Sequence, residues 1–132
     1  MKRALLILFS LAALASDANG ERAGVRCPAL TPKTAAQAII GEAGGETFTT
    51  QVAVACALRN RGTLRGVYGV NNPVVAHASA QQWARARLAW LTARQRDLVA
   101  GCRYFGCPAD APYFAALGLK PAFRSGTITF YR

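Results

Sequence analysis

Two carboxylates lie close together in a sequence that has few acidic residues. Only six of the 132 residues are Asp or Glu, and two of these are Glu42 and Glu46, on either side of a glycine pair. Glu42 is expected at the carboxyl end of an apolar helix, where desolvation and the helix dipole both raise the pKa of a carboxyl group. Such a group can act as a general acid near neutral pH. Glu42 is therefore the candidate catalytic residue, and an ordinary solvated carboxylate at a helix end is the alternative.

Other catalytic chemistries lack their residues. The only histidine, His77, has no nucleophile motif beside it. No phosphate-binding loop or dinucleotide fingerprint occurs. A metal site is not predicted either, because one histidine and no C-x-x-C spacing leave too few ligands. The sequence thus predicts chemistry that needs no metal and no cofactor.

The amino terminus has the pattern of a secretory signal peptide. Lys2 and Arg3 precede an apolar run over 4–14, and small residues follow as far as Gly20. This run is shorter than the roughly 20 residues that a membrane-spanning helix needs. We expect residues 1–20 to be removed and the mature chain to be soluble, in the periplasm, the cell wall or the extracellular space. An uncleaved amino-terminal anchor is the alternative.

The net charge indicates an anionic partner. The chain carries a formal charge of +10, which favours nucleic acid, acidic lipid or an anionic cell-wall polymer. Export argues against nucleic acid. The basic residues are scattered and form no single run, so a merely solvated cationic surface is the alternative. The oligomeric state is not specified by the sequence.

The four cysteines predict two disulfide bonds, because an even number in an exported chain usually forms pairs. Three pairings are possible. Cys102 and Cys107 flank a short turn that contains glycine, so they are the favoured pair. Cys27 and Cys56 would then form the second bond.

The predicted elements are mostly helical and form one domain over 34–132, after an extended lead-in over 21–33. Thr34 is predicted to cap the first helix, and a second, buried helix should follow the glycine pair. Two S/T-x-x-Q capping patterns, at Ser79 and Thr92, predict two more helices. The predicted helices cover 35–43, 51–59, 79–90 and 92–104. Trp83, Ala86, Leu88 and Trp90 should form the packing face of the third.

Few strands are expected. Residues 62–78 are rich in Gly and Asn and predict a long, partly ordered connection. Only 127–131 alternates β-branched and aromatic residues as a strand does. We therefore predict a mainly α, small domain with a long loop and at most a short strand pair.

Three segments resemble the core signature of the spore-cortex-lytic type of cell-wall hydrolases. That signature reads approximately G-E-A-x-G-E, then Q-V-A-V-A, then N-R. This chain has, in the same order, Gly41-Glu42-Ala43-Gly44-Gly45-Glu46, Gln51-Val52-Ala53-Val54-Ala55 and Asn60-Arg61. Weaker similarity continues to Phe130-Tyr131-Arg132. The resemblance implies a lysozyme-like, mostly α fold that cleaves the glycan strands of peptidoglycan.

The resemblance also implies roles for single residues. Glu42 matches the family's general acid/base, and Glu46 matches its second acidic position. One carboxylate suffices for a lytic transglycosylase, because the sugar's own C6 hydroxyl attacks the anomeric carbon, whereas a hydrolase normally uses two. Tyr113, Phe114 and Tyr131 are candidates for stacking on sugar rings, and a place in the hydrophobic core is the alternative for all three.

The chain departs from the family in several respects. The segment after Asn60-Arg61 is shorter than expected, and the cysteines are not a general feature of the family. Gly44 stands where the family usually has arginine, and Thr127 or Ile128 stands where it commonly has histidine. A non-catalytic, cationic wall-binding or inhibitory secreted protein is therefore the alternative to the enzyme.

Overall fold

The computed structural model describes residues 27–132. The predicted signal peptide and the first part of the lead-in lie outside the described residues. In chain order the elements are α2 (Pro32–Ala43), α3 (Phe48–Arg61), the 3₁₀ helices η1 (Tyr68–Asn71) and η2 (Pro73–His77), α4 (Ala80–Thr92), β1 (Tyr104–Gly106), the 3₁₀ helix η3 (Pro108–Asp110), α5 (Ala111–Ala116), β2 (Pro121–Ser125) and β3 (Ile128–Tyr131). None of the helices within this range is long and apolar enough to span a membrane.

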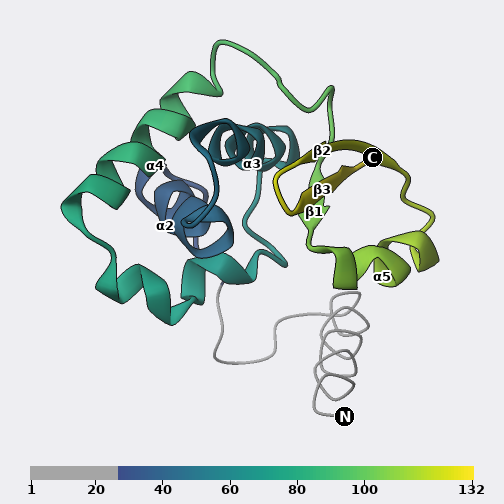
Figure 1. Ribbon diagram of the computed structural model, residues 1–132, viewed down its shortest axis with the longest axis horizontal. Helices are drawn as coiled ribbons and strands as arrows, with labels where there is room; N and C mark the ends of the chain where they lie inside the picture. The colour runs from purple at the N-terminus through teal and green to yellow at the C-terminus, as the bar shows by residue number, and fades with distance from the viewer. Residues whose placement is uncertain (1–26) are drawn as a thin grey trace.

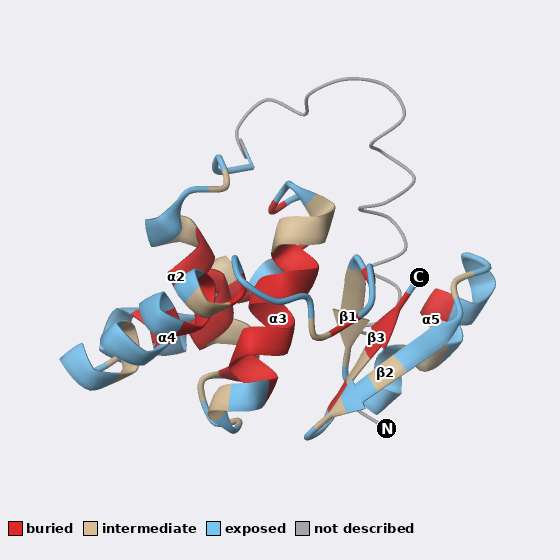
Figure 2. Cartoon of the chain, turned by 90° about the horizontal axis from the view of Figure 1, so that it is seen from above, coloured by how far each residue is buried: buried red, intermediate tan, exposed pale blue. Residues whose placement is uncertain are grey.

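Helix α3 lies at the centre of the molecule. Helices α2 and α4 pack on one side of it, and the small sheet with α5 lies on the other (Figure 1). Every residue from Thr50 to Leu58 is buried, as the red course of α3 in Figure 2 shows. Thr47 caps its first turn, and Gly62 ends it in the left-handed conformation at φ 74°. The predicted buried central helix is confirmed and extends further at both ends.

Helix α2 begins earlier than predicted. Its N-cap is Thr31, and Pro32 follows as the first helical residue, where its missing N–H costs nothing. Thr34, the predicted cap, instead completes the capping box, because its hydroxyl accepts the Thr31 N–H at 2.8 Å. The helix ends at Ala43, as the glycine pair predicted.

Helix α4 confirms one predicted capping box and contradicts the other. Ser79 and Gln82 cap each other reciprocally at its start. Thr92, in contrast, is the last residue of α4, and its hydroxyl donates to the Leu88 carbonyl oxygen at 2.8 Å. Residues 93–101 therefore form turns, with the Asp97 carboxylate accepting backbone N–H groups. Leu88 is 55% exposed, so its predicted place on the packing face was wrong.

The mainly α class is confirmed, and the sheet has one strand more than the predicted pair. Within residues 27–132, three antiparallel strands have the order β1-β3-β2. The predicted strand near 127–131 is β3, the central one, and its Phe130 is fully buried. Strand β2 was not predicted because it begins with Pro121, a residue that argues against a strand although an edge strand tolerates it.

The predicted disulfides are absent from the structure. All four cysteines are free, with Cys56 and Cys102 buried and Cys27 and Cys107 exposed. Each predicted pair would join a buried sulfur to an exposed one. The Cys56 thiol instead donates to the Arg96 carbonyl oxygen at 3.2 Å.

Candidate active site

Glu42 lies on the last turn of α2, and its side chain faces η1. Its Oε1 accepts a hydrogen bond from the backbone N–H of Gly69 at 2.7 Å. Two glycines make this approach possible. A Cβ on Gly41 would overlap the carbonyl oxygen of Gly69, and a Cβ on Gly69 would lie 2.5 Å from Cγ of Glu42. The backbone of η1 can therefore pack directly on α2 at the carboxyl group.

The surroundings of Glu42 raise its pKa above the ordinary value. Burial of the half-buried carboxyl group is the largest cause. The Gly69 N–H opposes it, because a hydrogen bond to the carboxylate lowers the pKa, and the negative charge of Asp110 raises it again. A carboxyl group of raised pKa keeps its proton to higher pH, as a general acid requires.

An open groove of 620 Å³ runs over the carboxyl end of α2 and holds both glutamates. Its walls are formed by Ile40, Gly41, Glu42, Ala43, Gly44, Gly45, Glu46, Asn72, Val74 and Gln82. Asn72 ties η2 to α2 by donating from Nδ2 to the Gly41 carbonyl oxygen at 3.2 Å. Gly44 and Gly45 place no side chains in this part of the wall, so a ligand can approach the backbone there.

Glu46 makes its contacts with the turn between β2 and β3. Its Oε1 accepts hydrogen bonds from the hydroxyl and the backbone N–H of Thr127. A Cβ on Gly126 in this turn would clash with the same carboxylate. Beside it, the buried Thr50 hydroxyl hydrogen-bonds Ser125 Oγ at 2.7 Å. Glu46 therefore joins the start of α3 to the β2–β3 hairpin.

Two of the three predicted sugar-stacking residues are buried. Phe114 and Tyr131 stack on each other, with ring centroids 4.4 Å apart and an angle of 28° between the rings. They are 8% and 3% exposed, so neither presents a face to a sugar and that prediction was wrong for both. Tyr113 is half-buried and packs edge-on against Phe114.

Sequence reasoning missed the residues that reach the site from the long connection. Gly69 and Asn72 contact the end of α2, although they lie 27 and 31 positions further along the chain than the residues that they bind. Tyr68, beside Gly69, is 61% exposed. Burial is the main cause that raises the pKa of Tyr113, and the nearby Tyr68 raises it further. Asp110 acts on Glu42 from η3. The only local signal was the richness of 62–78 in Gly and Asn, which indicates turns and does not say what they contact.

The described part of the chain does not bring together the ligands that a metal centre needs. Within residues 27–132, no three His, Cys, Asp or Glu side chains gather as a metal ion would require. The site consists of Glu42, its backbone partner and the groove.

The chain forms a small, mostly helical domain with a carboxyl group of raised pKa in an open groove, and two solved structures of catalytic domains have the same lysozyme-like fold. The crystal structure of the catalytic domain of the Bacillus cereus SleB protein matches with a TM-score of 0.55 and 26% identity, over 86% of this chain and 100% of its own. The catalytic domain of the germination-specific lytic transglycosylase SleB from Bacillus anthracis matches with a TM-score of 0.56 and 25% identity, over 76% and 93%.

These two structures confirm the resemblance to cell-wall hydrolases of the spore-cortex-lytic type. They also confirm the lysozyme-like fold that the resemblance implied. No protein-family model and no curated protein sequence matches the chain. The similarity therefore rests on the structure and on the ordered motifs of α2 and α3.

Proposed function

We propose that this protein cleaves the glycan strands of peptidoglycan as a lytic transglycosylase, with Glu42 as the general acid/base. The observation that carries the proposal is Glu42 itself, half-buried in an open groove with a raised pKa. The likeness to SleB catalytic domains supports it, since one of them is described as a lytic transglycosylase. The charge of +10 suits an anionic wall polymer.

The mechanism needs one carboxyl group that first gives and then takes a proton. Gly69 holds Oε1 of Glu42, so Oε2 carries the proton that is transferred to the glycosidic oxygen as the C–O bond breaks. The resulting carboxylate then takes the proton of the sugar's C6 hydroxyl. The C6 oxygen attacks the anomeric carbon and closes a 1,6-anhydro ring. Glu42 ends the cycle protonated, and no water is consumed.

The contacts of Glu46 favour this mechanism over hydrolysis. An inverting or retaining hydrolase places its second carboxylate at the substrate, as base or nucleophile. Glu46 is instead hydrogen-bonded to Thr127 of the β2–β3 turn. We assign it the role of a positioning residue that fixes the hairpin beside the groove.

Product analysis tests the proposal. The protein is incubated with purified peptidoglycan, and the soluble fragments are analysed by mass spectrometry. Fragments with 1,6-anhydro ends are expected. Reducing ends would show a hydrolase instead, and release of no fragment by a protein that still pellets with the wall would show the non-catalytic binder.

We further propose that the reaction takes place outside the cytoplasm, where peptidoglycan lies. Residues 1–20 would be removed on the way. The exposed Tyr68, next to Gly69, and the half-buried Tyr113 are candidates to contact sugar rings. The intact mass of the protein recovered from the wall fraction tests the processing. A mass that still includes residues 1–20 would contradict it.

A further inference from the structure

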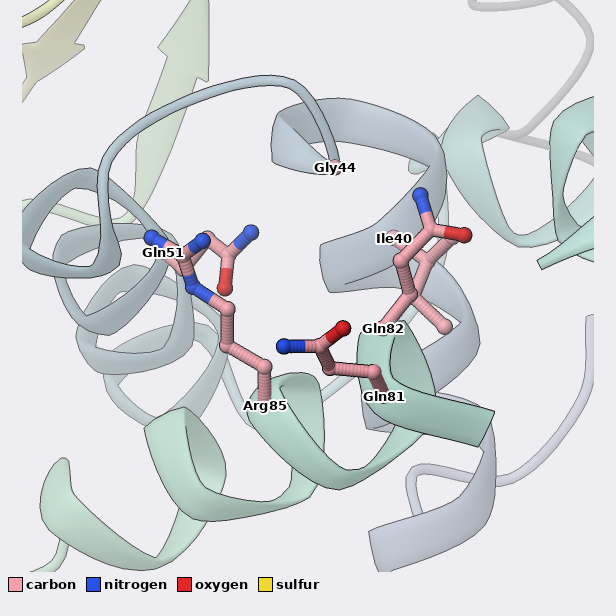
Figure 3. A pocket seen from close by; sticks show the side chains of 6 residues that line it. All are labelled: Ile40, Gly44, Gln51, Gln81, Gln82 and Arg85. Atoms are coloured by element: carbon pink, nitrogen blue, oxygen red, sulfur yellow. The ribbon is translucent and has the colours of Figure 1, made fainter. Parts of the chain in front are cut away.

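A second hollow, of 210 Å³, adjoins the groove that holds Glu42 (Figure 3). We call it the Gln51 pocket. It shares Ile40, Gly44 and Gln82 with the groove as common walls. Its other walls are Gln51 of α3 and Gln81 and Arg85 of α4. Four of its six residues therefore carry an amide or a guanidinium group.

Gln51 offers this pocket a buried hydrogen-bond acceptor. The residue is 4% exposed, and its Nε2 donates to the Ala43 carbonyl oxygen at 3.0 Å, which fixes the amide. Its Oε1 is buried and has no hydrogen-bond partner among residues 27–132. Figure 3 shows the amide directed into the pocket. Because a buried acceptor without a donor costs free energy, the site is built to receive an N–H or O–H group.

The α4 side of the pocket supplies a positive charge and further donors. The side chain of Arg85 extends towards Gln51 in Figure 3. Gln82 is held by its capping box, in which Oε1 accepts the Ser79 N–H at 2.8 Å, so the N–H groups of its amide remain for a ligand. A guanidinium group selects a carboxylate, which it binds through two parallel hydrogen bonds.

A ligand that combines an amide N–H with a nearby carboxylate is a short acidic peptide. We propose that the Gln51 pocket binds the peptide stem of peptidoglycan, with a stem N–H donating to Oε1 of Gln51 and a stem carboxylate binding Arg85. The proposal rests on the proposed function and adds to it the part of the substrate that lies beside the cleaved glycan. Shared walls place the stem next to the sugar at Glu42.

Binding of a fragment that cannot be cleaved tests the pocket by itself. The probe is N-acetylmuramoyl-L-alanyl-D-glutamate, which has no glycosidic bond, and its partner is the same molecule with both carboxylates converted to amides. Dissociation constants are measured by NMR titration of the full chain. The dicarboxylate should bind about tenfold more tightly than the diamide, as a charge-assisted hydrogen bond predicts. Shifts should appear at the side-chain amides of Gln51, Gln81 and Gln82.

Two variants of α4 distinguish binding in the Gln51 pocket from a general attraction of the acidic probe to positive charge. Arg85→Gln should bind the two probes equally. Arg87→Gln removes the same charge from an exposed position outside the pocket, over the Trp83 ring, and should keep the tenfold preference. Circular dichroism checks the fold of both. Equal binding of both probes by the wild type, or equal effects of the two variants, would overturn the proposal.

Failure of the pocket and failure of the proposed function give different results. If the wild type prefers the acidic probe but releases no anhydro products from peptidoglycan, the pocket stands and the transglycosylase falls. If it cleaves peptidoglycan but shows no preference between the probes, the enzyme stands and the pocket falls.

Discussion

Replacing Gly69 by alanine tests whether the contact between η1 and Glu42 matters for catalysis. The added Cβ would lie 2.5 Å from Cγ and 2.8 Å from Cδ and Oε1 of Glu42. Such distances are too short to persist, so either the carboxyl group turns away or η1 moves off α2. Both movements break the 2.7 Å hydrogen bond from the Gly69 N–H.

The size of the effect follows from that hydrogen bond. A hydrogen bond to a charged group contributes about 1.5–3 kcal/mol, and about 1.4 kcal/mol of barrier changes a rate tenfold. Gly69→Ala should therefore slow muropeptide release by about tenfold to a hundredfold. Overpacking should also lower the free energy of unfolding by about 1–3 kcal/mol. The pKa of Glu42 should rise further, because the bond that lowers it is lost.

Three measurements check this prediction: the rate of muropeptide release, urea unfolding, and NMR titration of the Glu42 carboxyl carbon. Gly45→Ala is the control for stability and for the pKa, since a Cβ there meets no atom within 4 Å. A Gly69→Ala protein with the wild-type rate and an unchanged pKa of Glu42 would refute the reasoning.

The remaining predictions concern Asp110, the contact between Glu46 and Thr127, and the cysteines. Asp110→Asn removes a charge that raises the pKa of Glu42, so the high-pH limb of the rate profile should move to lower pH, and an unmoved limb would contradict this. Thr127→Val removes the hydroxyl that donates to Glu46 and should lower the free energy of unfolding, measured in urea, by about 0.5–1.5 kcal/mol. Glu46→Gln should keep activity within about tenfold of wild type. Abolished activity in Glu46→Gln would indicate a two-carboxylate hydrolase. A thiol reagent should label the two exposed cysteines of the native protein and all four after unfolding, whereas native labelling of four or none would be the contrary result.

The thiol prediction follows from burial. Cys56 and Cys102 lie in the core, and burial raises the pKa of both thiols. A protonated, buried thiol reacts slowly with soluble reagents. Cys27 and Cys107 lack that protection because they are exposed.

The sequence predicted the features of the site that depend on neighbours along the chain. An apolar helix that ends at a glycine pair is a local pattern, and it places Glu42 on the last turn of α2. The heavily apolar run after Thr50 likewise predicts a buried α3. The resemblance to the family rests on these same two segments.

The parts that depend on contacts between distant segments could not be predicted. Gly69 contacts Glu42 only because η1 packs on α2, and Asp110 affects the pKa of Glu42 through its charge from η3. No pattern in a single sequence records these pairings. The Thr92 pattern also misled, since a capping box predicts a helix start only where the preceding helix has ended. Phe114 and Tyr131 have the composition of a sugar platform, yet they fill the space between α5 and the sheet.

The raised pKa of Glu42 determines how this residue affects stability at different pH values. The folded-state pKa of Glu42 lies above the unfolded value, so the folded protein holds this proton more tightly. Below the unfolded pKa the carboxyl group is neutral in both states and costs nothing. The cost appears as the pH rises and is complete above the folded pKa. Glu42→Gln should therefore be at least as stable as wild type at pH 7.

The most direct measurement is the rate at which Glu42→Gln releases 1,6-anhydro fragments from purified peptidoglycan. Glutamine keeps an oxygen that accepts the Gly69 N–H, so the groove keeps its shape while the transferable proton is lost. We predict a rate about 10²–10⁴-fold below wild type, as for the loss of a general acid/base, in a variant that unfolds at the wild-type urea concentration or above it. Release at the wild-type rate would contradict the assignment of Glu42 as the catalytic residue.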